Sequence, residues 1–378
     1  MSHQLPRPTL RGNHRIWQVM EAQGDLAAAG RLKAPRPRPG VHRFDPRCFD
    51  NEEDVLGRLA ALGMARIAPV YRLGGPDAIQ VHGYIEGEPL SAVRPPGSPL
   101  SGHELGQMVE LFGRLVAMPP EAFAPIHRCP VVLRPRTCAE FLHGLVRFTR
   151  RRVYAVHRHT TGNLFAALGV RPEVLAADGP LARAADRLTE RPFALLHGDL
   201  HRDNLIVAEA DGLLWTIDWE LALLGDPLYD LATHLHLMRY PAAQENELLT
   251  RWARMVEDNL PGAAAGLVRD LPHYLAYKRV QSVFTDVIRQ ALVVRATRPA
   301  ELDEQLPRTA TMVSSALRRA ARVLGLTRVP SLRSVEDAYA AWYRDPTGPA
   351  RPPEPAPAAP VTPLALSPMV RWRRRATG

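Results

Sequence analysis

The sequence is poor in cysteine and has no long apolar run. Its three cysteines, Cys48, Cys129 and Cys138, are odd in number and form no Cys-x-x-Cys pair. We therefore expect three unpaired thiols rather than a disulfide framework or a zinc site. No stretch is apolar enough to span a bilayer, and prolines and arginines interrupt the first thirty residues, which excludes a signal-peptide core there. A cytoplasmic protein without membrane contact is expected.

Lysine is almost absent as well. Only Lys33 and Lys278 occur, yet Lys and Arg together number 48 against 39 Asp and Glu, so arginine supplies nearly all the positive charge. A basic surface attracts anions, nucleotide phosphates included. The basic residues are scattered and accompany no nucleic-acid motif, so we do not expect nucleic-acid binding.

The first part of the chain is predicted to form short strands and one helix. Residues Arg15–Met20 alternate between apolar and polar, and the apolar run Leu26–Lys33 is the expected partner strand, followed by a proline-rich loop over 34–46. Helical spacing covers Asn51–Leu62. Two more strands, Ile67–Leu73 and Ile79–Ile85, flank an expected turn at residues 74–77.

Composition changes after residue 85. Residues 86–101 are rich in proline and glycine and are predicted to form a linker. Helical patterns then dominate, and three short strand patterns interrupt them near 193–196, 205–207 and 213–217. The expected helices cover about 102–117, 138–168, 173–190, 227–239, 244–258, 271–294, 300–325 and 334–344. The prediction is an α+β protein with a small antiparallel β lobe at 1–85, a hinge at 86–101 and a larger helical lobe at 102–345. The Pro/Ala-rich tail 346–378, with its basic end, is expected to be disordered.

Two segments between these predicted strands carry the chemistry. A polar loop, His197–Asn204, follows the first strand and presents Asp199 and Asn204, while the next hairpin carries Asp218 back to the same place. Two carboxylates and one carboxamide at strand ends form a hard-oxygen site suited to Mg²⁺. Protein kinases space their catalytic Asp and metal-binding Asn in the same way as Asp199 and Asn204, and place a further metal-binding Asp later in the chain.

The combined segments resemble the signature of the aminoglycoside phosphotransferase and choline kinase group. The resemblance is carried by His197–Asn204, by Ile217-Asp218-Trp219-Glu220 and by residues 225–232, which read Gly-Asp-Pro-Leu-Tyr-Asp-Leu-Ala. It implies a bilobal protein-kinase-like fold with ATP bound between the lobes; GTP is left open as the donor. It also implies that Asp199 is the catalytic base and that Asn204 and Asp218 are the Mg²⁺ ligands.

The same resemblance suggests nucleotide contacts in the first lobe. Kinases hold the α- and β-phosphates with a strand lysine that pairs with a helix glutamate. Lys33 is the only lysine before the catalytic loop, and Glu52 is the matching glutamate, with Glu53 as the near alternative. Gly12 is the only glycine where kinases have a glycine-rich loop. The hinge would lie at Tyr84–Glu88, with Tyr84 and Glu86 beside adenine.

Several neighbouring residues have simpler explanations than catalysis. We expect His197 to be a structural histidine that bonds the loop backbone, and we expect Asp226 and Asp230 to cap helices. Two roles stay open for His201: it orients a phosphate, or it faces solvent. Asp203 is expected to pin the catalytic loop.

The charge of the acceptor is left open by the sequence. The arginine-rich helix at about 140–158 would disfavour a polycationic acceptor if it lay near the acceptor side. Acidic residues in the late helices, Asp286 among them, are candidate amine ligands, although Asp286 shares its helix with Lys278 and Arg289.

The predicted function is that of an ATP-dependent O-phosphotransferase acting on a hydroxyl of a small metabolite or antibiotic. Its partners would be a nucleoside triphosphate and a small hydroxylated acceptor. Two alternatives remain: a peptide Ser/Thr kinase in a modified-peptide pathway, suggested by the arginine-rich helix and the basic tail, and a pseudokinase that only binds nucleotide, suggested by the poor glycine loop.

Overall fold

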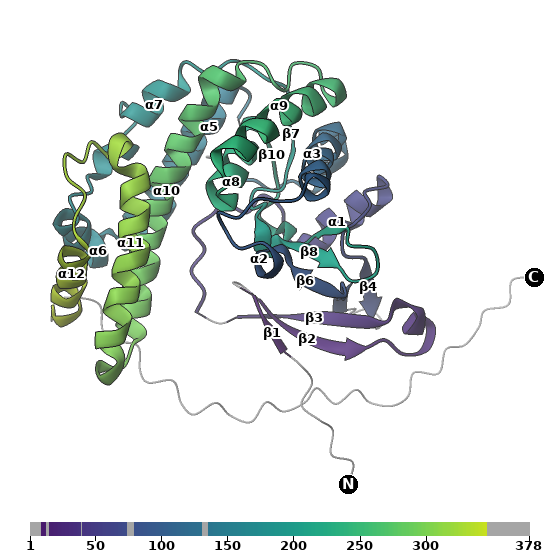
Figure 1. Cartoon of the computed structure of the whole chain (residues 1–378), viewed down its shortest axis with the longest axis horizontal. Coiled ribbons are helices and arrows are strands. Elements are labelled where there is room, and N and C mark those ends of the chain that lie inside the picture. The colour runs from purple at the N-terminus through teal and green to yellow at the C-terminus, as the bar shows by residue number, and fades with distance from the viewer. Residues whose placement is uncertain (1–8, 13–14, 39, 74–78, 131–134, 346–378) are drawn as a thin grey trace, which may run out of the picture.

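The computed structural model describes residues 9–12, 15–38, 40–73, 79–130 and 135–345. A small antiparallel sheet lies at one end of the molecule and a larger, mostly helical part forms the rest (Figure 1). The sheet has the order β1-β2-β3-β5-β4. Its strands are β1 (Thr9–Arg11), β2 (Arg15–Glu21), β3 (Arg31–Pro37), β4 (Val70–Leu73) and β5 (Ile79–Gly83). The turn expected at residues 74–77 and the tail 346–378 lie outside the described residues.

The partner strand of β2 is displaced from its expected position. Residues Gly24–Ala29 form a 3₁₀ helix, η1, and β3 starts only at Arg31. Both Gly24 and Gly30 have positive φ, and an alanine-rich run between them has little strand propensity. At its other end β3 continues to Pro37 in what was expected to be a loop. Its prolines are tolerated there because β3 pairs with β5 only at Leu32 and Lys33, and β2 is its partner beyond that point.

Helix α1 (Glu52–Ala61) follows the expected spacing closely. Asn51 caps it, since its side-chain oxygen accepts a hydrogen bond from the Asp54 N–H at 2.8 Å. Val55, Leu56 and Leu59 are buried on one face, so the helix packs into the core and presents its first turn towards the second lobe.

The expected linker is in fact docked onto the second lobe. Strand β6 (Gly87–Pro89) and helix α2 (Leu90–Val93) form within it, and β6 pairs with β8 (Leu205–Ala208). Gly87 allows this pairing, because a Cβ at its position would lie 2.1 Å from the Val207 carbonyl oxygen. Strand β8 pairs in turn with β9 (Leu214–Thr216), so the connection between the lobes becomes the edge of a three-stranded sheet.

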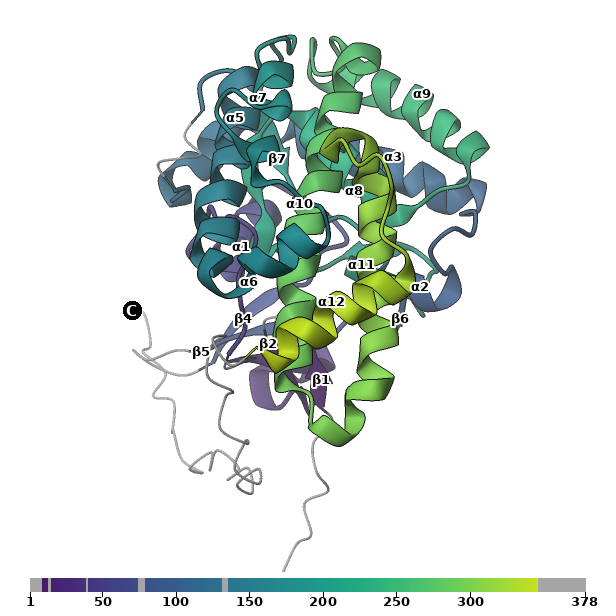
Figure 2. The same cartoon turned by 90° about the vertical axis from the view of Figure 1, so that its left-hand side faces the viewer.

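Helices make up most of the second lobe, as predicted. The expected helix at 138–168 is continuous but contains a π turn, whereas the one expected at 173–190 breaks at Gly179 into a short 3₁₀ helix and α7. Figures 1 and 2 show α10 running through the lobe with α11 beside it. The bounds are α3 (Gly102–Ala117), α4 (Pro120–Phe123), η2 (Ala124–Ile126), α5 (Cys138–Phe148), η4 (Thr149–Tyr154), α6 (Ala155–Ala167), η5 (Pro172–Leu175), α7 (Pro180–Ala185), α8 (Pro227–Met238), α9 (Ala242–Asn259), α10 (Leu267–Ala296), η8 (Pro299–Glu301), α11 (Leu302–Leu324) and α12 (Leu332–Arg344).

The cysteines depart from the expectation of three unpaired thiols. Cys48 and Cys129, which are far apart in sequence, form a disulfide, while Cys138 is a buried free thiol. Spacing along the chain could not reveal this pair, because the bond depends on tertiary packing of the segments before α1 and after η2. Within the described residues, no helix combines the length and the apolar character that crossing a membrane would require.

Candidate active site

The catalytic loop begins where strand β7 (Ala194–Leu196) ends, and its turn is held by a buried carboxylate. Asp230, on α8, accepts hydrogen bonds from the N–H groups of His197 at 3.0 Å and Gly198 at 2.8 Å. Gly198 has a φ of 80°, and a Cβ there would lie 2.3 Å from the Leu221 carbonyl oxygen. Only glycine fits this turn, and Asp230 braces it rather than capping a helix as expected.

His197 makes two hydrogen bonds within the loop and is fully buried. Its Nε2 lies 3.1 Å from the Ile217 carbonyl oxygen, and its Nδ1 accepts a hydrogen bond from the Asp199 N–H at 3.3 Å. Burial lowers the pKa of His197 to about 4, so the ring is neutral. This geometry agrees with the structural histidine predicted from the sequence.

Asp199 and Asn204 lie in direct contact. The Asn204 side-chain nitrogen donates to the Asp199 backbone oxygen at 2.8 Å and to the Asp199 carboxylate at 3.3 Å. His201 Nε2 lies 3.4 Å from the same carboxylate. Burial would raise the pKa of Asp199, but the hydrogen bond and charge of His201, with His197 and Lys278, hold it below its ordinary value. Asp199 is therefore ionised at neutral pH.

Asp218 reaches the same place through the β8–β9 hairpin. The Ile217 N–H donates to the Asn204 carbonyl oxygen at 3.0 Å, which places Asp218 next to the catalytic loop. Its φ of 64° is left-handed, a strained conformation that Asp tolerates better than most residues and that recurs at functional sites. Burial, together with Glu52, Glu220 and Asp199, raises the pKa of Asp218 well above its ordinary value, and Arg47 opposes this.

These donors fit a divalent cation. Several carboxylates repel one another around Asp218 in a buried setting, and a bound cation would remove that repulsion. The amide nitrogen of Asn204 is engaged with Asp199, so its oxygen is the atom suited to a hard metal. The site is therefore a chemically suitable Mg²⁺ site.

The first lobe brings a different cation to the helix glutamates than the sequence predicted. Arg15 lies 3.3 Å from Glu52 and 2.7 Å from Glu53, and Glu53 is also 3.0 Å from His82. Glu52 additionally accepts a hydrogen bond from the Trp219 N–H at 3.0 Å, which ties α1 to the segment after Asp218.

Lys33 lies nearby without forming an ion pair to a described residue. Its ammonium group sits 4.5 Å from the centroid of the Trp17 ring. Burial lowers its pKa, while the charges of Glu52 and Asp218 raise it. Lys33 is therefore close enough to Glu52 and Asp218 to feel both charges, and it forms an ion pair with neither of them.

The remaining first-lobe residues are placed as follows. Gly12 turns the chain between β1 and β2, and its N–H donates to the Arg15 carbonyl oxygen at 2.9 Å. At the hinge, the Tyr84 N–H donates to the Arg31 oxygen at 2.8 Å, and the Glu86 oxygen accepts from Glu209 at 2.9 Å. The Glu86 carboxylate pairs with Arg31, which also lies over the Tyr84 ring. These backbone groups are engaged within the protein, so adenine would have to use other groups of the hinge.

A buried arginine that the sequence analysis passed over joins the linker to the catalytic loop. Arg202 is 2% exposed and donates to the carbonyl oxygens of Arg94 at 2.7 Å, Ser98 at 2.8 Å and Met238 at 3.2 Å. The only sequence signal for it was its position inside the polar loop His197–Asn204.

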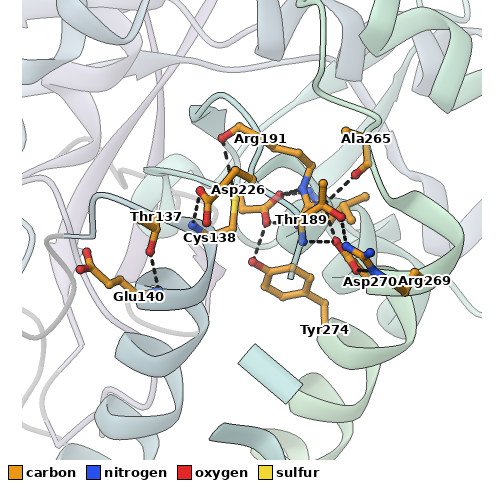
Figure 3. A network of polar contacts seen from close by, with 12 residues as sticks. Thr137, Cys138, Glu140, Thr189, Arg191, Asp226, Ala265, Arg269, Asp270 and Tyr274 are labelled. Atoms are coloured by element: carbon orange, nitrogen blue, oxygen red, sulfur yellow. Dashed lines mark hydrogen bonds and ion pairs between the residues drawn. The ribbon is translucent and has the colours of Figure 1, made fainter. Parts of the chain in front are cut away.

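The Gly-Asp-Pro segment is anchored by a buried ionic network (Figure 3). Asp226 caps α8 through the Leu228 N–H at 3.0 Å, as expected, and also forms a two-pronged ion pair with Arg191 at 2.8 and 2.6 Å. Arg191 binds Asp270 of α10 at 2.7 Å, and the Tyr274 hydroxyl donates to Asp226 at 2.7 Å. This network holds β7, α8 and α10 together beneath the catalytic loop.

A cavity of about 730 Å³ adjoins the loop. Its lining includes Asp199, His201 and Asp218 together with residues of α10 and with Arg319 of α11. Space for a substrate therefore lies directly against the candidate catalytic and metal-binding groups.

Comparison with known proteins agrees with this geometry. The family model described as "Phosphotransferase enzyme family" matches residues 22–267. Among solved structures, an ethanolamine kinase from Plasmodium vivax is 12% identical, with a TM-score of 0.53 and coverage of 82% of this chain and 81% of that one. A choline kinase from Cryptosporidium parvum is also 12% identical, with a TM-score of 0.50 and coverage of 84% and 90%. No curated protein matches the sequence. The kinase-like bilobal fold expected from the sequence is confirmed.

Proposed function

Because this chain belongs to the Phosphotransferase enzyme family, we propose that it transfers the γ-phosphoryl group of ATP to a hydroxyl of a small molecule. The observation that carries the proposal is that Asp199 and Asp218 line one cavity and that Asn204 contacts Asp199 beside it. A scaffold that only binds partners has no physical need for two half-buried carboxylates and a carboxamide held together against the repulsion between the carboxylates.

In the proposed reaction the acceptor oxygen bonds to the γ-phosphorus while the bond from that phosphorus to the bridging oxygen of ADP breaks. Asp199 accepts the hydrogen bond of the attacking hydroxyl, orients it, and takes its proton before releasing it to solvent. The lowered pKa of Asp199 makes it a weak base, which suits a loose transition state in which the proton moves late. His201, 3.4 Å away, supports the ionised form of Asp199.

Asn204 and Asp218 are the residues that would hold Mg²⁺, and the ion would offset the negative charge of the phosphates. Lys33 would bind the α- and β-phosphates from the opposite lobe. The contacts around Lys33 support this role. Arg15 pairs with Glu52 and Glu53, so the Lys33 ammonium group has no ion-pair partner among the described residues.

The test is ADP release by the full chain with ATP, Mg²⁺ and a panel of small alcohols, including the amino alcohols that the structural neighbours' names mention. We expect turnover that requires Mg²⁺ and that Asp199→Asn lowers about 10²- to 10⁴-fold, while nucleotide binding persists. Asp258→Asn, an exposed acid on α9, is the control and should behave as wild type.

Two outcomes would contradict the proposal. If Mg-ATP binds but no acceptor of any size is phosphorylated, the chain is a pseudokinase. If Asp199→Asn and Asp258→Asn have equal activity, the catalytic group lies elsewhere.

A further inference from the structure

The part of the cavity lining that comes from the end of α8, from α10 and from α11 is rich in cations. Arg239 ends α8, Lys278 lies on α10 and Arg319 lies on α11, and all three line the cavity. Figures 1 and 2 show α10 and α11 side by side, with α8 packed against α10. The arginine-rich helix near residue 150, which the sequence suggested as a source of positive charge, contributes no residue to this lining.

Two carboxylates of the cavity lining are engaged with partners other than these three cations. Asp286 is committed to Arg289 at 3.0 Å and also accepts the Ser282 hydroxyl at 3.0 Å. Asp45 accepts a hydrogen bond from the Gln281 side chain at 2.8 Å. None of Arg239, Lys278 and Arg319 forms an ion pair with a described residue.

Two of the three cations, Arg319 and Lys278, have donor groups that remain available to a ligand. The Arg319 guanidinium donates once, to Ser315 at 2.9 Å, and its Nε is buried with no hydrogen-bond partner among the residues described. Lys278 is 8% exposed, lines the cavity, and places its ammonium group 5.3 Å from the centroid of the Tyr229 ring. A buried guanidinium nitrogen without a hydrogen-bond partner is costly unless a ligand completes it, and an ammonium group that lines a cavity is available to the same ligand.

The pKa values of neighbouring groups are lowered by the positive charge of these cations. Burial lowers the pKa of His236 to about 3, and the charges of Lys278, Arg319, Arg279 and Arg239 lower it further in that order. Burial also lowers the pKa of Arg319, with Arg239 as the next cause, although Asp286 opposes this. A bound anion would relieve this repulsion, whereas an ammonium ligand would add to it.

We propose that the acceptor carries an anionic group, a carboxylate or a phosphate, besides its hydroxyl, and that Lys278, Arg239 and Arg319 bind that group. Lys278 and Asp199 line the same cavity, so one acceptor can reach both. The proposal rests on the kinase function above and specifies its substrate class. Lys278 and Arg319 lie beyond residue 267, where the family match ends, whereas Arg239 lies within it.

Binding of simple anions to the nucleotide-loaded protein tests the proposal. The full chain is saturated with Mg²⁺ and AMP-PNP and titrated calorimetrically with inorganic phosphate, malonate and, as a cation, ethanolamine, at constant ionic strength. We expect phosphate or malonate to bind, ethanolamine not to bind, and Lys278→Met and Arg319→Met each to weaken anion binding roughly tenfold. Arg254→Met, an exposed arginine on α9, is the matched control and should bind anions as wild type does.

Acceptors matched in size supply the second measurement. Glycerol is neutral, glycerate and glycerol 3-phosphate are anionic, and serinol is the corresponding cation. We expect kcat/KM to follow the order anionic, neutral, cationic, and glycerate against glycerol 3-phosphate separates a carboxylate from a phosphate as the preferred group.

The outcomes separate this inference from the function on which it rests. Failure of wild type to bind Mg-AMP-PNP would refute the kinase function itself. Nucleotide binding with unchanged anion affinity in both variants would refute only the anionic acceptor, as would a preference for serinol. If both variants instead lose AMP-PNP affinity, these cations serve the nucleotide, and the inference is wrong.

Discussion

At the scale of single residues, Asp218 is held in a state that favours function over stability. Its backbone is left-handed, and three carboxylates with burial disfavour its charge. Asparagine tolerates the same backbone conformation and carries no charge. We therefore expect Asp218→Asn to raise the free energy of unfolding of the metal-free protein by about 1 kcal/mol and to weaken the Mg²⁺ dependence of turnover at least tenfold. Urea unfolding without metal and Mg²⁺ titration of activity measure the two effects, and a variant less stable than wild type would contradict the account.

Glu53 gives the protein a defined sensitivity to acid. Burial disfavours its charge, but His82 and Arg15 outweigh burial and lower its pKa from 4.5 to about 2. A carboxylate whose pKa is lowered by folding stabilises the fold fully at any pH above the pKa that it has in the unfolded chain. This contribution is lost as the pH falls from about 4.5 towards 2. The difference corresponds to about 3 kcal/mol.

We therefore expect Glu53→Gln to lose less stability than wild type between pH 6 and pH 3, because glutamine has no proton to gain. Urea unfolding at both pH values measures this. Glu121→Gln, an exposed glutamate on α4, is the control and should match the wild-type pH response. An unchanged pH response in Glu53→Gln would show that other groups set the acid sensitivity.

The proximity of the candidate site residues could be predicted from the sequence because it is local. Asp199 and Asn204 lie within one loop and are in contact, and Asp218 follows one hairpin later. Their catalytic and metal-binding roles stay predictions. Arg15 could not be found in this way, since its ion pairs join a strand to a helix 37 and 38 positions away in the chain. Charge pairing across elements is decided by packing, which no local pattern records.

At the scale of elements, Arg202 connects three segments that must keep their positions during catalysis. Its fork serves carbonyl oxygens in the linker and at the end of α8. We expect Arg202→Met to lower the free energy of unfolding by about 2 to 4 kcal/mol, because buried carbonyl groups lose their donors. Arg202→Lys should recover only part of this, since one ammonium cannot match the planar fork. Urea unfolding tests both, and full stability in Arg202→Lys would contradict the role of the fork.

The prediction of helices and strands succeeded where an apolar pattern repeats over many residues. It failed where a few residues determine the local structure. The helices from α8 to α12 each begin and end within a few residues of their predicted bounds, because many apolar positions repeat in register. The partner strand of β2 was misplaced because Gly24 and Gly30, both with positive φ, enclose a short 3₁₀ helix. Composition alone does not distinguish such a helix from a strand. The linker was mistaken for a bare hinge because its pairing with β8 is a tertiary event.

At the scale of the whole molecule, the Arg191 network joins parts of the second lobe that are far apart in sequence. Arg191 and its two aspartates are fully buried in their side chains and link the start of β7 to α8 and α10. Removing one partner of a buried ion pair leaves the others uncompensated. We expect Arg191→Met to lower the free energy of unfolding by about 3 to 5 kcal/mol, measured in urea, and to reduce turnover with it because the network supports the catalytic loop.

The cost should come from the stranded charges rather than from the lost contacts. If so, adding Asp226→Asn and Asp270→Asn to Arg191→Met should restore part of the stability, because both carboxylates are then neutral and asparagine can still cap α8 at position 226. A triple variant less stable than Arg191→Met alone would show instead that the hydrogen bonds to Leu228, Thr189 and Tyr274 need charged oxygens. The difference in stability between Arg191→Met and the triple variant therefore shows whether the charges of this network stabilise the lobe or only fix its geometry.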